Sequence, residues 1–175
     1  MIYLRDLKTN DWKEFDLSDT QALKERKIEI DDNVYIGDSV YIDNGVTIKS
    51  YAHISLKAKL GLNVYISHNA FIGYIAVIGD NAYINNSARI GFWGKVPEND
   101  RPNTILITGK YNISYWGEDK IQIGRAVKSI DFWLSESGID ILRMFKMPED
   151  QIAKYVGYIA IIKSIHETEM KRKNS

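Results

Sequence analysis

The chain of 175 residues has three histidines and no cysteine, so thiolate catalysis and disulfide bonds are excluded. Imidazole is then the main candidate for acid–base chemistry near neutral pH. His166 lies on or beside an apolar stripe near the end of a helical pattern, and we expect it to be structural. The search for a general base therefore falls on His53 and His68, which both lie in a repetitive segment.

The repetitive segment runs from Ile28 to Gly91 and has a period of six. A large aliphatic residue occupies the same place in every hexad: Ile30, Ile36, Ile42, Ile48, Ile54, Leu60, Ile66, Ile72, Ile78, Ile84 and Ile90. A small apolar residue usually stands two positions earlier, and turn pairs such as Asn44-Gly45 and Asp80-Asn81 follow. A helix cannot keep a period of six on one face, whereas a short strand and a tight corner can. The pattern predicts a solenoid of parallel β coils.

This repeat resembles the hexapeptide-repeat transferases, whose left-handed β-helix has three short strands and eighteen residues per coil. The implied fold is mainly β: a left-handed parallel β-helix over 28–91, preceded by an N-terminal cap over 1–27. We expect a loop over 92–103, where the period stops. A small antiparallel β meander and C-terminal helices are expected over 104–175.

The flanking segments give more local expectations. Leu17 to Thr20 is expected to cap a brief helix that runs through Arg26. Period-two alternation predicts strands at 105–107, 111–115 and 120–123. From Ser129 the pattern becomes helical, with an interruption near Gly138 and a second start at Pro148.

A coil of eighteen residues would stack outward side chains in columns. One face would present Tyr35, His53, Phe71 and Arg89. The next corner would present Asp38, Leu56, Tyr74 and Phe92, flanked by Ile75 and Trp93. Exposed corners should be polar, so the C-terminal module or a neighbouring subunit is expected to cover the apolar part of this one.

The hexad Ile66-Ser67-His68-Asn69-Ala70-Phe71 resembles the one that carries the catalytic histidine in sugar N- and O-acyltransferases of this fold. The resemblance implies that His68 is the general base and that Asn69 orients it or contacts substrate. It implies acetyl-CoA or another acyl-CoA as cofactor, a homotrimer, and an active site in a groove between subunits. His53 is the second choice for a base. The ligand-binding candidates are Ser50, Tyr65, Phe71, Tyr74, Tyr83, Arg89, Trp93, Lys95 and Arg101.

Two alternatives to an acyltransferase remain open. The aromatic columns also suit a non-catalytic trimer that binds or sequesters a small molecule, and the small size would fit a phage or mobile-element protein. A third interpretation is a scaffold that assembles through its C-terminal helices. A trimeric carbonic anhydrase of this fold is rejected, because its zinc needs three histidines and only two lie on the repeats; no metal is expected.

Composition narrows the partners and the compartment. Lysine plus arginine equals aspartate plus glutamate at 23 each, so net charge does not favour nucleic acid or an anionic membrane. No apolar run is long enough to span a bilayer, and the start of the chain lacks the pattern of a signal peptide. We therefore expect a cytoplasmic protein whose partners are a small molecule and copies of itself.

Overall fold

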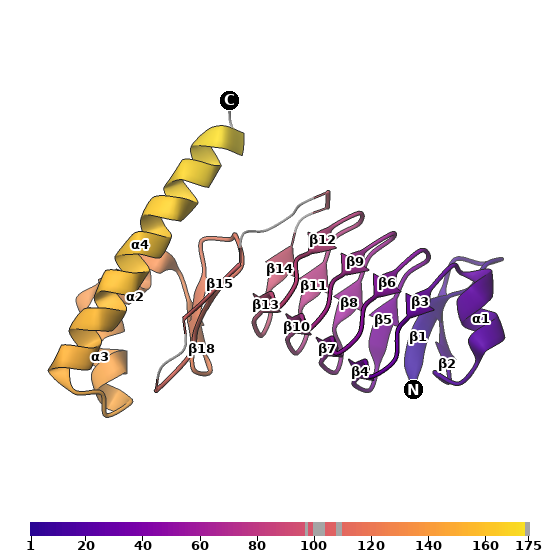
Figure 1. The fold of residues 1–175 in the computed structure, drawn as a ribbon, viewed down its shortest axis with the longest axis horizontal. Coiled ribbons are helices and arrows are strands. Elements are labelled where there is room, and N and C mark those ends of the chain that lie inside the picture. The colour runs from indigo at the N-terminus through magenta and orange to yellow at the C-terminus, as the bar shows by residue number, and fades with distance from the viewer. Residues whose placement is uncertain (97, 100–103, 108–109, 174–175) are drawn as a thin grey trace.

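The structure, a computed structural model, describes residues 1–96, 98–99, 104–107 and 110–173. Its centre is a parallel β-solenoid of very short strands (Figure 1). These strands are β3 (Glu29–Ile30), β4 (Tyr35–Ile36), β5 (Val40–Ile42), β6 (Thr47–Ile48), β7 (His53–Ile54), β8 (Lys59–Leu60), β9 (Tyr65–Ile66), β10 (Phe71–Ile72), β11 (Val77–Ile78), β12 (Tyr83–Ile84), β13 (Arg89–Ile90) and β14 (Lys95–Val96). The predicted mainly β fold, with an antiparallel meander and C-terminal helices, is confirmed.

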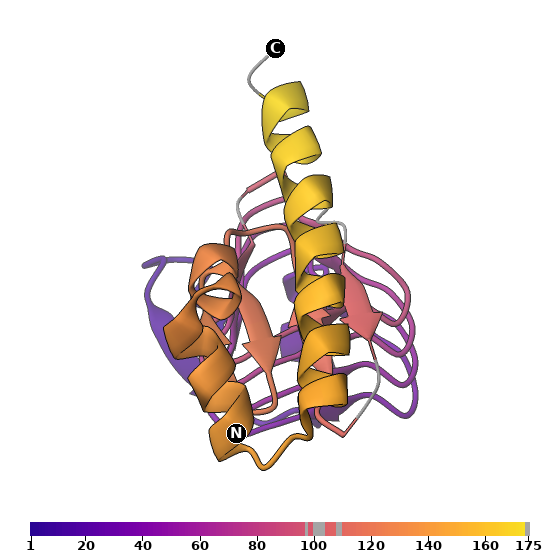
Figure 2. The ribbon, with the colours of Figure 1, turned by 90° about the vertical axis from the view of Figure 1, so that its left-hand side faces the viewer.

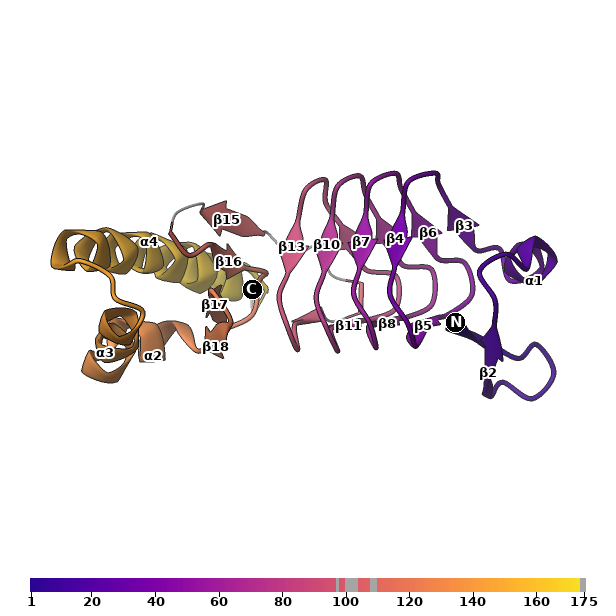
Figure 3. The ribbon, with the colours of Figure 1, turned by 90° about the horizontal axis from the view of Figure 1, so that it is seen from below.

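The solenoid strands form three sheets. Their orders are β14-β11-β8-β5-β1-β2, β13-β10-β7-β4 and β12-β9-β6-β3. Two of these rows, β13 to β4 and β11 to β5, are visible side by side in Figure 3. Partners in each sheet are eighteen residues apart, as His53 pairs with Phe71 and Phe71 with Arg89. The predicted coil length and the predicted columns are therefore correct.

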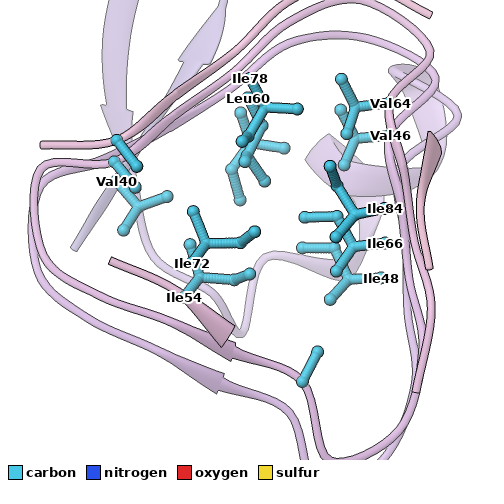
Figure 4. Close-up of a cluster of buried hydrophobic side chains, with 14 of the residues drawn as sticks. Val40, Val46, Ile48, Ile54, Leu60, Val64, Ile66, Ile72, Ile78 and Ile84 are labelled. Carbon is cyan, nitrogen blue, oxygen red and sulfur yellow. The ribbon is translucent and has the colours of Figure 1, made fainter. Parts of the chain in front are cut away.

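The large aliphatic residues of the repeat point into the solenoid, where they stack in columns such as Ile48, Ile66 and Ile84 (Figure 4). From Ile42 to Ile90 each of them is at most 1% exposed. Burying one such side chain stabilises the fold by about 1.5–3 kcal/mol. Ile30 and Ile36, in the first hexads, are only partly buried.

Every corner of the solenoid holds one residue in the left-handed backbone region. These residues recur every sixth position: Asn33, Ser39, Gly45, Tyr51, Lys57, Asn63, Asn69, Ile75, Asn81, Ser87, Trp93 and Asn99. Asparagine and glycine tolerate this conformation, whereas other residues adopt it at a cost of roughly 1–2 kcal/mol. Tyr51, Ile75 and Trp93 are thus held in an unfavourable backbone conformation.

The solenoid extends one strand beyond Gly91, where we had expected a loop over 92–103. Val77 N donates to Gly94 O at 2.8 Å, and Gly79 N donates to Val96 O at 2.7 Å. Val96 is 1% exposed and takes the inward position of the hexad. The sequence pattern missed this hexad because glycine replaces the small apolar residue at Gly94 and valine replaces the large one.

Residues 1–27 close the N-terminal end. Strand β1 (Ile2–Arg5) pairs parallel to β5 and antiparallel to β2 (Trp12–Phe15), so it continues a solenoid sheet. Helix α1 (Thr20–Glu25) follows as expected, with Asp19 accepting a capping hydrogen bond from Ala22 N. The buried guanidinium of Arg26 donates to Arg5 O at 2.7 Å and fixes the helix against the strand.

The C-terminal module begins with an antiparallel sheet of β15 (Ile105–Ile107), β16 (Ile113–Tyr115), β17 (Ile121–Ile123) and β18 (Ala126–Lys128). Strand β18 was not predicted, because Ala126-Val127-Lys128 holds a single large apolar residue and shows no alternation. Helices α2 (Ile130–Leu134), α3 (Glu136–Met144) and α4 (Glu149–Lys173) pack on this sheet (Figure 2).

The interruption of the first helical segment falls at Ser135, not near Gly138 as expected. Ser135 ends α2 and also caps α3, where its hydroxyl accepts from Gly138 N. Gly138 is buried inside α3, and a Cβ there would lie 2.3 Å from Phe132 O. The glycine therefore serves close packing between the helices and does not break one.

The C-terminal module closes the other end of the solenoid through Trp116. This side chain is 1% exposed and belongs to the solenoid core, while its sequence neighbour Tyr115 belongs to the core of the module. Gly91 leaves the necessary room, because a Cβ there would lie 2.7 Å from the Trp116 ring. In the described residues, no helix has both the length and the apolar character needed to cross a membrane.

Candidate ligand-binding site

A cleft of about 830 Å³ lies where the solenoid corner of Trp93 meets the C-terminal module. Its walls are Trp93, the turn 117–120 between β16 and β17, the segment 127–129 at the end of β18, and His166, Met170 and Lys173 of α4. We call it the Trp93 cleft. Its volume lies within the range of roughly 300–1,000 Å³ that is usual for small-molecule sites.

Trp93 is the aromatic wall of the cleft. Its side chain is 60% exposed, and its backbone has φ of 55°, the left-handed conformation of the solenoid corners. Trp93 N donates to Tyr74 O at 3.0 Å, which ties this corner to the one below. An exposed indole on a rigid corner is a preformed surface for stacking a planar ring.

Charged groups of both signs line the opposite wall. Lys120 Nζ lies 3.6 Å from Glu118 Oε2, while Asp119 accepts from Ile130 N at 3.3 Å and so supports the start of α2. Lys128 Nζ lies 5.3 Å from the centre of the Phe132 ring and forms no ion pair with any described carboxylate. The cleft thus offers a cation for an anionic group of a ligand.

Glu118 provides a second polar group that a ligand could contact. Its Oε2 atom is shielded from solvent, and apart from the 3.6 Å ion pair with Lys120 it accepts no hydrogen bond within the described part of the chain. A shielded acceptor without a donor costs free energy. A ligand N–H or O–H group in the cleft would supply the missing donor.

His166 lies at the same cleft. Its Nδ1 atom is 3.0 Å from the hydroxyl of buried Tyr115, and that hydroxyl donates to Glu169 Oε2 at 3.4 Å. A hydroxyl has one proton, so when Glu169 accepts it, His166 donates from Nδ1 to the hydroxyl oxygen. The contact with Tyr115 confirms a packing role for His166, but the residue also lines the cleft, which sequence reasoning missed.

The predicted catalytic pair lies on another edge of the solenoid. His68 and Asn69 are both exposed at the corner between β9 and β10, and Asn69 has φ of 57°. Asn69 N donates to Ser50 O at 3.2 Å, which confirms that the corner stacks on that of Ser50. Ser50 Oγ donates to Asp31 at 3.3 Å, and no described residue hydrogen-bonds the His68 ring.

His53, the second choice for a base, is part of a stack. Its ring lies 4.4 Å from the Tyr35 ring and 5.0 Å from the Phe71 ring, at 23° to each. Partial burial between these rings lowers the pKa of His53, and the positive charge of Arg89 lowers it further. Both effects favour neutral imidazole, and the stack gives the ring a structural role.

The remaining predicted ligand-binding residues do not gather in one place. Tyr65 and Tyr83 stack at 4.7 Å on the sheet of β9 and β12, and Lys95 is exposed on the sheet of β14. Tyr74 lies at the corner below Trp93. Phe71 and Arg89 line a separate small cavity. Arg101 lies outside the described residues, as do residues 97, 100, 102 and 103 of the predicted loop.

We expected the C-terminal module or a neighbouring subunit to cover the apolar corner. Within one chain Leu56 and Trp93 are 45% and 60% exposed, so cover by a neighbouring subunit stays a prediction. The module covers the end of the solenoid through Trp116 and leaves these corner side chains accessible. In the described residues, no group of three or more potential metal-ligating side chains is arranged to hold a metal ion.

Comparisons with known proteins add little to this geometry. No protein-family model and no curated protein matches the sequence. Among solved structures, a candidate acetyltransferase from Bacillus cereus is similar over 81% of this chain and 95% of its own, with 17% identity and a TM-score of 0.18. A similarity this low carries no functional argument, so the function must be inferred from the site. The parallel β-solenoid itself is consistent with the hexapeptide-repeat fold.

Proposed function

We propose that this protein binds a small molecule that carries a planar ring and an anionic group, of the nucleotide type, in the Trp93 cleft. The observation that carries the proposal is the exposed Trp93 indole, fixed in a left-handed corner at the mouth of an 830 Å³ cleft. The left-handed conformation recurs at every described corner, so what distinguishes Trp93 is its exposed ring on the wall of the cleft.

Each part of a nucleotide has a counterpart in the cleft. Stacking a base on an aromatic side chain contributes about 1–3 kcal/mol. The ammonium group of Lys128 suits a phosphate, and the shielded Glu118 oxygen suits a base amine or a ribose hydroxyl. The opposed cationic and anionic groups would also fix the orientation of the ligand.

Acetyl-CoA or another acyl-CoA, the cofactor that the hexapeptide resemblance implies, fits these residues. Trp93 would stack on the adenine ring and Lys128 would pair with a phosphate. The cofactor would supply an acyl group activated as a thioester. Other nucleotides and sugar nucleotides share the ring and the phosphate, so binding and turnover must be tested separately.

The binding test is a thermal unfolding series with acetyl-CoA, ADP and a UDP-sugar. A ligand at ~100 times its dissociation constant stabilises the native state by about 2.7 kcal/mol. We expect at least one of the three to raise the midpoint, and Trp93→Ala to abolish the shift. Trp12→Ala is the matched control, because Trp12 lies in the N-terminal cap against Tyr41. Equal shifts in wild type and Trp93→Ala would place the ligand elsewhere.

Acyl transfer in a homotrimer, with His68 as general base, is the second candidate function. One observation favours it: His68 is exposed at a corner, without a hydrogen-bond partner in the described residues, and is free to act on a substrate. His68 would remove the proton from an acceptor hydroxyl or amine as that group attacks the acyl carbon of the thioester. The C–S bond would then break, and the CoA thiolate would leave and take up the proton from His68. Asn69 would contact the acceptor.

Variants at the two sites separate the candidates. His68→Ala should abolish acyl transfer and leave the thermal shift with acetyl-CoA intact, whereas Trp93→Ala should lose both. Retained turnover in His68→Ala would remove His68 from the mechanism. A ligand that stabilises the protein and is recovered unchanged with every acceptor would instead favour sequestration.

A further inference from the structure

Arg89 lies at the end of a stacked column on the sheet formed by β4, β7, β10 and β13. The column runs from Tyr35 through His53 and Phe71 to Arg89, whose Cζ atom lies 4.5 Å from the centre of the Phe71 ring. A guanidinium that stacks on a ring keeps its N–H groups directed sideways, in the plane of the guanidinium. In the described part of the chain, Arg89 donates no hydrogen bond to an acceptor and forms no ion pair.

A cavity of about 180 Å³ lies beside this guanidinium, between β13 and the meander. Phe71 and Arg89 line it from the solenoid, and Asn112, Ser114 and Gln122 line it from β16, β17 and the preceding turn. Ser114 is buried at 7% exposure. The cavity therefore combines a cation with neutral hydrogen-bonding side chains, and no carboxylate lines it.

Gln122 forms a fixed part of the wall of this cavity. Gln122 Nε2 donates to Gly124 O at 2.8 Å, and its Oε1 accepts from Phe92 N at 3.3 Å. A Cβ at Gly91 would lie 2.0 Å from that Oε1 atom. Both polar atoms of the terminal amide are thus held in place, which makes this wall preorganised.

We propose that the Arg89 cavity binds a small oxyanion, the carboxylate or phosphate group of a small molecule or the free anion. A planar, stacked guanidinium fits two oxygens of such a group at once, and Ser114 and Asn112 can donate to the others. The cavity shares no lining residue with the Trp93 cleft, so this site does not depend on the proposed function.

The test is a titration of the ¹⁵N-labelled chain with sodium phosphate and with sodium acetate at constant ionic strength, with sodium chloride as the reference. We expect one or both oxyanions to cause saturable shifts at the Arg89 Nε–H and Gln122 side-chain signals. Arg89→Gln should weaken binding at least about tenfold, as expected for a lost hydrogen bond to a charged group. Arg125→Gln removes the same charge from an exposed position outside the cavity and should bind like wild type.

A second variant and a second signal keep the test decisive if Arg89→Gln fails to fold. Arg89→Lys keeps the charge but loses the two-pronged geometry, and it should bind several-fold more weakly than wild type. Because the charge of Arg89 lowers the pKa of His53, a bound oxyanion should raise that pKa. A stronger response to phosphate assigns the site to phosphate groups, and a stronger response to acetate assigns it to carboxylates. Shifts that match those with chloride, or that persist in Arg89→Gln, would overturn the proposal.

Discussion

The left-handed corners make a quantitative prediction at Tyr51. Tyr51 lies at a corner with φ of 63° and is 63% exposed, whereas Tyr35 lies on extended strand β4 and is 57% exposed. The two rings therefore lose a similar area when they are truncated. Comparing alanine with glycine at each position then isolates the backbone contribution.

At Tyr51 we expect the glycine variant to be more stable than the alanine variant. Alanine keeps the Cβ penalty of the left-handed region, roughly 1–2 kcal/mol, and glycine removes it at an entropic cost of about 0.5–1 kcal/mol. At Tyr35 only the entropic cost remains, so alanine should be the more stable variant by that amount. The preference for glycine over alanine should thus differ between the sites by about 1–2 kcal/mol.

Urea denaturation of the four variants, Tyr51→Gly, Tyr51→Ala, Tyr35→Gly and Tyr35→Ala, measures this difference directly. In thermal unfolding it corresponds to about 2–4 °C per kcal/mol for a chain of this size. The difference in unfolding free energy between the glycine and the alanine variant must change sign between Tyr51 and Tyr35. An alanine variant at Tyr51 as stable as the glycine variant would show that the corner does not hold the left-handed conformation.

Three further predictions follow from packing, charge and exposed surface. Gly91→Ala should destabilise the fold by about 1–3 kcal/mol in urea denaturation, because a Cβ there meets Gln122 and the Trp116 ring; an unchanged midpoint would refute the docking of the module. His53 has a lowered pKa in the folded state, so neutral His53 contributes to stability. This contribution is fully present above pH ~6.5, the unperturbed pKa, and is lost as the pH falls through the folded pKa. His53→Phe keeps the stack and should lose less stability than wild type between pH 7 and pH 5; equal losses would contradict this. The exposed apolar corners predict a homotrimer, with a mass in light scattering about three times the chain's 20.1 kDa, and a monomeric mass would exclude the inter-subunit groove.

The solenoid was predictable from the sequence because each hexad carries its own local signal. An inward aliphatic residue such as Ile66 and a corner residue such as Asn69 recur at fixed spacing, and stacking then follows from the period. The prediction ended one strand early because Gly94 and Val96 replace the usual alanine or valine and the usual isoleucine of the hexad. The backbone hydrogen bonds nevertheless continue. Strand β18 was missed because Ala126-Val127-Lys128 has a single large apolar residue and so shows no alternation, unlike Ile121 and Ile123 in the equally short β17.

The Trp93 cleft could not be found in the same way. The sequence marked Trp93 as an apolar residue at a corner, but Lys128 and His166 lie in segments whose patterns signal only secondary structure. Packing of the module on the solenoid brings them together. That contact depends on Gly91, whose position in the repeat does not distinguish it from Gly73 or Gly79, and on Trp116, which lies outside the repeat. The candidate base His68 was found from its hexad, yet it lies on a different edge from the cleft.

The most direct test of the central claim is to map bound ADP or acetyl-CoA on the ¹⁵N-labelled protein by amide and indole chemical shifts. The Trp93 cleft predicts that the largest changes fall on the Trp93 indole, the turn 117–120 and the segment from Lys128 to Ser129. Changes that gather around Ser50 and His68 while the Trp93 indole signal stays fixed would contradict the claim and move the ligand to the other edge of the solenoid.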